Sequence, residues 1–128
     1  MAKPAHKCAI KRAYEAPARG DGARILVDRL WPRGLRKDAA QFEQWRKDLS
    51  PSTALRQFYG HRSERFAEFT KRYLAELRAP EASAAVAELI DLNRRRPVTL
   101  LTASQDLEHS GAAVLAKHLH RRIQRSLA

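Results

Sequence analysis

Residues 24–34, RILVDRLWPRG, place an aspartate and two arginines at the end of an apolar run. Arg29 and Arg33 carry planar guanidinium groups, whose donors suit a phosphate or a carboxylate. Asp28 could orient one of these arginines or act as a base. The alternative is structural, because an ion pair between Asp28 and an arginine would stiffen the loop over a packed Trp31. This segment is either an anion pocket or a tightly packed loop.

Residues 50–61 supply further polar groups that could reach the same ligand. Ser50 or Ser52 can cap a helix, with Pro51 at its first position and Gly60 at its end. The free backbone amides at such a helix start also bind anions, and Arg56 lies about one turn further along. His61 is either a helix-end histidine or a catalytic one. We therefore include Ser52, Arg56 and His61 among the candidate ligand-binding residues.

Residues 98–104, VTLLTAS, form a second apolar run that ends in polar residues. Ser104 could contact a ligand, or Ser104 or Asp106 could cap the last helix. The start of that helix would point its positive end towards the arginines. His109 is either a proton-transfer group or a surface residue of the first turn. Ser104 and His109 complete the candidate site.

The motifs of the familiar enzyme classes are absent from this sequence. It has no P-loop, dinucleotide-binding glycine fingerprint, nucleophile elbow or metalloprotease helix. The single cysteine, Cys8, has no partner for a disulfide and no neighbouring metal ligands at a useful spacing, so we expect no metal site. The residues identify no cofactor and no catalytic group, and they leave open whether the protein is an enzyme.

A net charge of +11 over 128 residues is the strongest feature of the composition. Such a charge attracts polyanions and anionic small molecules. The excess is spread along the chain without a known nucleic-acid-binding module, so we expect at most weak, salt-sensitive and non-specific nucleic-acid binding. There is no long apolar run and no secretory signal, which favours a cytoplasmic protein without membrane contact.

The apolar pattern predicts one small α/β domain over residues 1–128. Buried strands are expected at residues 24–28 and 98–104, an outer strand at 8–14 and a short edge strand at 41–49. Helices are expected at residues 50–60, 63–77, 81–95 and 108–127. This order favours a mainly parallel sheet with helices on both faces. Ligands of such sheets bind at the carboxyl ends of the strands, where Asp28 would lie beside Ser104.

Several segments together resemble the YeaO-like family of bacterial proteins, a family of unknown function. The resemblance covers about residues 8–120 and is carried by ILVDRLWPRG (25–34), Trp45, KDLSPSTALRQFYGH (47–61), an aromatic pair with LAEL (69–77) and VTLLTAS (98–104). It implies a small α/β fold and a cytoplasmic bacterial protein. Relatives tend to carry an aromatic residue in the last strand and an Asn-His pair at the last helix, whereas this chain has Thr102 and then His109, Ser110 and Gly111.

The sequence thus predicts an anion-accepting pocket at the carboxyl edge of the sheet, in a protein that could process a small molecule. The alternatives are a basic protein associated with nucleic acid and a protein-interaction domain without catalysis. The residues do not indicate an oligomeric state. The candidate ligand-binding residues are Asp28, Arg29, Trp31, Arg33, Ser52, Arg56, His61, Ser104 and His109.

Overall fold

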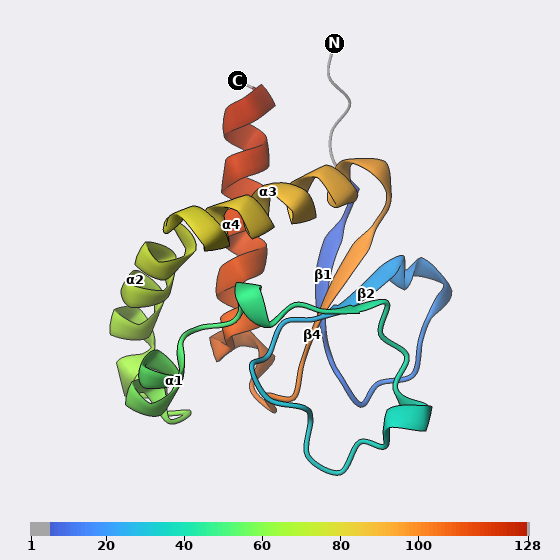
Figure 1. Cartoon of the computed structure of the whole chain (residues 1–128), viewed down its shortest axis with the longest axis horizontal. Coiled ribbons are helices and arrows are strands. Elements are labelled where there is room, and N and C mark those ends of the chain that lie inside the picture. The colour runs from blue at the N-terminus through green and yellow to red at the C-terminus, as the bar shows by residue number, and fades with distance from the viewer. Residues whose placement is uncertain (1–5, 128) are drawn as a thin grey trace.

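The computed structural model describes residues 6–127, and its strands form a parallel sheet (Figure 1). The strands are β1 Cys8–Arg12, β2 Ala23–Leu26, β3 Gln44–Trp45 and β4 Val98–Thr102. They lie in the order β1-β4-β2-β3, and each neighbouring pair is parallel. The two apolar strands β2 and β4 are therefore adjacent and central. The predicted outer strand and short edge strand are found at the two sides of the sheet.

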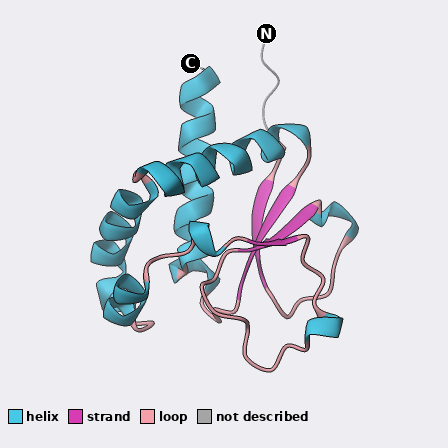
Figure 2. Ribbon diagram, in the orientation of Figure 1, coloured by secondary structure: helices cyan, strands magenta, loops and turns pink. Residues whose placement is uncertain are grey.

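The helices lie in the four segments where the sequence predicts them (Figure 2). Their bounds are α1 Thr53–Tyr59, α2 Phe66–Leu77, α3 Pro80–Arg95 and α4 Gly111–Leu127. Each helix contributes to one apolar core, for example through Leu55, Tyr73, Leu89 and Leu115, which pack in the same cluster as Ile25 of β2. Within residues 6–127, no helix is long and apolar enough to cross a membrane.

The α/β class and the mainly parallel sheet are confirmed, and loop residues supply much of the cover on the second face of the sheet. Its apolar cluster consists of Leu26 and Leu101, from β2 and β4, together with Ala13, and the partly buried rings of Trp31, Phe42 and Trp45 pack against it. The connections from β1 to β2 and from β2 to β3 contain prolines and glycines, which oppose regular helix. Large aromatic side chains from these connections cover the sheet where a helix would otherwise lie.

The start of α1 differs from the prediction by a few residues. Ser52, not Ser50, is the N-cap, because its Oγ accepts a hydrogen bond from the Leu55 amide at 3.1 Å. Ser50 instead follows a short 3₁₀ turn, and its hydroxyl donates to the Lys47 carbonyl at 2.6 Å. Gly60 ends the helix with a φ of 52°, the left-handed conformation that favours glycine. The predicted end of α1 is thus confirmed.

The cap of α4 also differs from the prediction. A 3₁₀ turn, Leu107–His109, separates Ser104 and Asp106 from the helix, so neither residue caps it. Ser110 takes that role, because its Oγ accepts from the Ala113 amide at 3.2 Å. The same hydroxyl donates to the Leu107 carbonyl at 2.7 Å, which ties the turn to the helix start.

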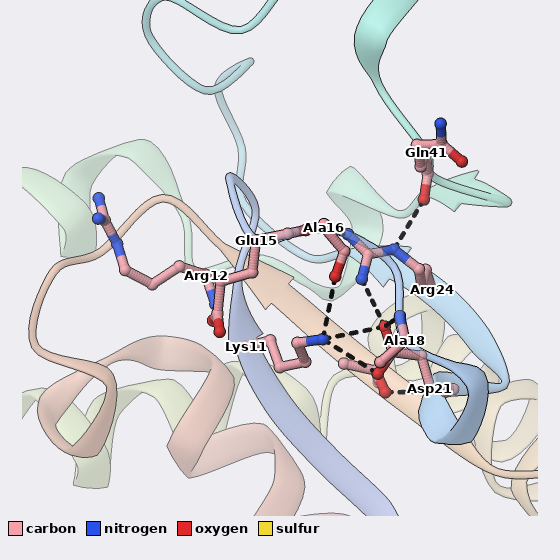
Figure 3. Close-up of polar contacts among 9 residues, drawn as sticks. Lys11, Arg12, Glu15, Ala16, Ala18, Asp21, Arg24 and Gln41 are labelled. Carbon is pink, nitrogen blue, oxygen red and sulfur yellow. Dashed lines mark hydrogen bonds and ion pairs between the residues drawn. The ribbon is translucent and has the colours of Figure 1, made fainter.

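A buried polar network fixes the loop between β1 and β2 (Figure 3). Lys11 donates to both carboxylate oxygens of Asp21 at 3.1 Å, and Arg24 donates to Asp21 Oδ2 at 2.6 Å. Arg24 also donates to the carbonyls of Glu15 and Gln41, at 2.8 and 2.9 Å. Two cations thus share one carboxylate, and the remaining donors bind backbone carbonyls. The network joins β1, β2 and the loop before β3.

Candidate functional site

A cavity of about 490 Å³ lies at the carboxyl ends of β2 and β4. The two strands are hydrogen-bonded in parallel, with Leu26 opposite Leu101, so their exits lie side by side. Residues 27–33 after β2 and residues 102–105 after β4 line the cavity, together with parts of α1 and the start of α4. The hollow is thus at the edge where parallel α/β sheets usually bind their ligands.

Most of the predicted ligand-binding residues line this cavity: Asp28, Arg29, Trp31, Arg33, Arg56, His61, Ser104 and His109. Ser52 does not. Its amide and hydroxyl donate to the carboxylate of Glu76, at 2.8 and 2.6 Å, while its oxygen caps α1. Ser52 therefore has a structural role between α1 and α2.

Asp28 links the two strand exits, because its Oδ2 accepts a hydrogen bond from the Ala103 amide at 2.8 Å. Neither Arg29 nor Arg33 forms an ion pair with this carboxylate in the described part of the chain, so a structural pair between them is excluded. The carboxylate is bound instead by the amide of Ala103, which directly follows β4.

Burial raises the pKa of the Asp28 carboxyl above its ordinary value. Two hydrogen bonds, from Ala103 and Thr102, lower this pKa, as do the nearby side chains of His61 and Arg56. Together they lower the pKa by less than burial raises it. A partly desolvated carboxyl therefore lies at a cavity that also contains the cationic side chains of Arg29, Arg33 and Arg56.

The three arginines of the cavity differ in their contacts. Arg29 donates through Nε to the Pro51 carbonyl at 3.0 Å, which ties the loop after β2 to the segment before α1. The guanidinium groups of Arg33 and Arg56 make no hydrogen bond or ion pair with any other described residue. Both residues are exposed at the cavity. Their donors are thus available to an anion.

The two histidines of the cavity lie at helix ends. His61 follows the α1 C-cap and has a φ of 58°, a left-handed conformation that non-glycine residues rarely adopt. His109 Nδ1 lies 2.8 Å from Asp106 Oδ2, and its ring meets Phe66 edge-on at a centroid distance of 5.0 Å. Asp106 and Phe66 therefore hold the His109 ring, whereas His61 is exposed.

The start of α4 completes the cavity, because Ser110, Gly111 and Ala112 line it. The positive end of this 17-residue helix lies at the cavity wall. A Cβ added to Gly111 would lie 3.4 Å from Pro51 Cγ, so the helix start packs closely on the segment before α1. A helix start of this kind provides amides for a bound anion.

Arg12 and Tyr14 support the site, although neither is among the candidate residues predicted from the sequence. Arg12 donates to the carbonyls of Ala103 and Ser104, at 3.1 and 3.2 Å, and its guanidinium lies 4.9 Å from the Tyr14 ring centroid. The Tyr14 hydroxyl donates to the Arg33 carbonyl at 2.8 Å. Together they join the two loops at the cavity. The signal that could have identified them is their position at the end of the outer strand expected at residues 8–14.

The described residues include no group of three or more His, Cys, Asp or Glu side chains arranged to hold a metal ion. Burial raises the pKa of the Cys8 thiol to about 11. Because the thiolate is the nucleophilic form, this cysteine is unreactive near neutral pH. Cys8 also lies in β1 and packs against the apolar core.

The fold is that of a small α/β protein with a parallel sheet, and a cavity lined by both arginines and apolar side chains lies at the carboxyl edge of that sheet. The chain belongs to the family described as the inactive DUF488-N3 subclade, which matches residues 7–127.

Curated relatives agree with the resemblance to YeaO-like proteins. The chain is 48% identical over 113 residues to uncharacterized protein Rv3073c of Mycobacterium tuberculosis (strain ATCC 25618 / H37Rv), a match that covers 88% of this chain and 93% of the relative. It is 39% identical over 109 residues to uncharacterized protein YeaO of Escherichia coli (strain K12), covering 85% and 93%. No solved structure matches this chain.

Proposed function

We propose that this protein binds an anionic small molecule in the cavity between the exits of β2 and β4 and the start of α4. The proposal rests on the guanidinium groups of Arg33 and Arg56. Both line the same cavity, and neither forms an ion pair with a described residue. The helix start adds a third positive element to the same wall. Charge-assisted hydrogen bonds from arginine forks to a phosphate or carboxylate are among the strongest that a site can offer.

Binding without catalysis fits this cavity better than a reaction does. Its side chains include no activated nucleophile, and Cys8 lies away from it with a protonated thiol. The description of the matching family as inactive points in the same direction. We therefore propose that this is a cytoplasmic protein that binds a ligand without transforming it. A purely structural protein-interaction domain is less well supported, because the arginines and Asp28 are not paired with one another.

A second candidate, weak nucleic-acid binding, is favoured by one surface. Lys117, Arg121 and Arg125 follow one another at intervals of four residues on α4, and all three are exposed. They form no ion pair with the described residues. Such a row can neutralise phosphates without reading a base sequence. This row of basic residues does not line the cavity. The place at which a ligand binds therefore distinguishes the two candidate functions.

The anion-binding proposal predicts that phosphate or sulfate raises the melting temperature of the wild-type protein at constant ionic strength. A ligand that binds only the native state stabilises it by about 2.7 kcal/mol at about 100 times its Kd. Arg33→Ala should remove most of this response while leaving the melting temperature without anion nearly unchanged, because the side chain is exposed and forms no hydrogen bond or ion pair with the described residues. Thermal melting with increasing anion concentration measures both effects.

Arg36→Ala is the matched control for this experiment. Arg36 lies on the same loop, but it pairs with Asp38 in solvent and does not line the cavity. It should keep the full response to phosphate. Equal responses of the wild type and Arg33→Ala to every anion would refute the proposed site.

A further inference from the structure

The cavity has apolar walls that an inorganic anion would not use. Val27, Leu30, Trp31, Tyr59 and Phe69 line it beside the cationic groups. Its volume, about 490 Å³, lies within the range of pockets that hold drug-sized ligands, which is roughly 300 to 1,000 Å³. A bound phosphate or sulfate alone would leave most of this surface without contact.

Leu30 is the clearest sign of a missing apolar contact. Leu30 is 56% exposed at the cavity. The other exposed large hydrophobic residue of the described chain, Tyr14, holds the Arg33 carbonyl through its hydroxyl. Leu30 lies between the two arginines of the loop, Arg29 and Arg33. An apolar group on a ligand would cover Leu30, while a negatively charged group on the same ligand would contact an arginine.

The aromatic side chains of the cavity are held in fixed positions. Trp31 donates through Nε1 to the Leu35 carbonyl at 2.6 Å, and its ring meets Trp45 edge-on at a centroid distance of 5.4 Å. Tyr59 stacks on Phe69 at 4.3 Å, and its hydroxyl donates to the His109 carbonyl at 2.6 Å. Rigid rings of this kind favour a flat partner, because neither side loses much conformational freedom on contact.

We infer that the ligand is an aromatic or heteroaromatic anion, with its phosphate or carboxylate at Arg33, Arg56 and the start of α4 and its ring against Leu30 and Trp31. This inference rests on the proposed anion site and adds the chemical class of the ligand. Guanidinium planes can also stack on aromatic rings, so the arginines favour a ring over an alkyl chain.

The test compares four probes by isothermal titration calorimetry at constant ionic strength: phosphate, phenyl phosphate, hexyl phosphate and uncharged phenol. Phenyl phosphate should bind at least about tenfold more tightly than phosphate, because it adds aromatic contact and apolar burial. Hexyl phosphate should bind more weakly than phenyl phosphate, and phenol should bind least.

Leu30→Ser tests the position of the ring. Because Leu30 is exposed, this substitution removes little buried surface and should leave the fold intact. This variant should reduce the preference for phenyl phosphate over phosphate several-fold. Equal affinities of the wild type for phosphate and phenyl phosphate would overturn the aromatic class while leaving the anion site in place. Equal affinities for hexyl and phenyl phosphate would also overturn it. If none of the three charged probes bound, both the anion site and the aromatic ligand class would be refuted.

Discussion

Asp21→Ala should lower the free energy of unfolding by about 3 to 5 kcal/mol, because it leaves two buried or partly buried cations without their partner. The Asp21 and Arg24 side chains are only 9% and 7% exposed, and Lys11 shares the same carboxylate. The lost acceptor also serves the Ala18 amide, at 2.9 Å. Urea denaturation of the wild type and the variant measures the loss.

Asp38→Ala is the control for this prediction. Asp38 pairs with Arg36, but the side chains of this pair are 68% and 80% exposed. An exposed pair of this kind contributes at most about 1 kcal/mol. Similar losses in Asp21→Ala and Asp38→Ala would show that the network around Asp21 contributes no more than a surface pair.

The pH dependence of stability gives a second readout of the same network. Burial alone would raise the pKa of Asp21, but the hydrogen bonds from Ala18, Arg24 and Lys11 outweigh it and hold the pKa below its ordinary value of 3.8. Because the folded pKa is the lower one, the stabilisation is present above the unfolded pKa and is lost as the pH falls through the folded pKa. The acid-induced loss of stability should therefore be smaller in Asp21→Ala.

Trp31→Ala should cost about 3 kcal/mol of stability, at the lower end of the range for removing a large aromatic side chain. The ring is only partly buried, but it packs against Phe42 and Trp45 at centroid distances of 5.5 and 5.4 Å and covers the apolar cluster of Leu26 and Leu101 on the sheet. Chemical denaturation measures this cost.

Trp31→Phe should recover part of that loss, because it keeps an aromatic ring on the sheet but cannot donate to the Leu35 carbonyl. If Trp31→Ala cost less than about 1 kcal/mol, the ring would contribute little to the fold and would serve mainly as cavity surface.

The location of the cavity could be predicted from the sequence because it depends on strand pairing alone. Two continuous apolar runs, each followed by polar residues, indicate buried parallel strands, and parallel strands end at the same edge. Asp28, Arg33 and Ser104 are therefore expected around one hollow, and all three line the cavity in the structure. The spacing of apolar residues likewise predicted α2, α3 and α4, and the serine, Pro51 and Gly60 at its two ends predicted α1.

The layer on the second face could not be predicted in the same way. The apolar run at residues 25–27 indicates burial on both faces but does not identify what covers it. Here the cover comes from Trp31, Phe42 and Trp45, whose packing depends on how a long connection folds back. A pattern of local spacing contains no information on such a contact.

The roles of single polar residues also depended on distant partners. Ser52 is held by Glu76, a residue of α2, and Asp28 is bound by the amide of Ala103 rather than by a neighbouring arginine. Arg12 acts on the loop after β4, far along the chain. Residue type identified these side chains as polar and capable of binding, but only the three-dimensional arrangement assigns each one its partner.

The most direct test of the anion site is a phosphate titration followed by the backbone amide signals in two-dimensional NMR, at constant ionic strength. Saturable shifts are expected for Arg33 and Ser104 and for Gly111 and Ala112 at the start of α4, with the amides near Asp21 unchanged. Shifts that do not saturate, or that occur instead along Lys117 to Arg125 of α4, would contradict ligand binding in the cavity.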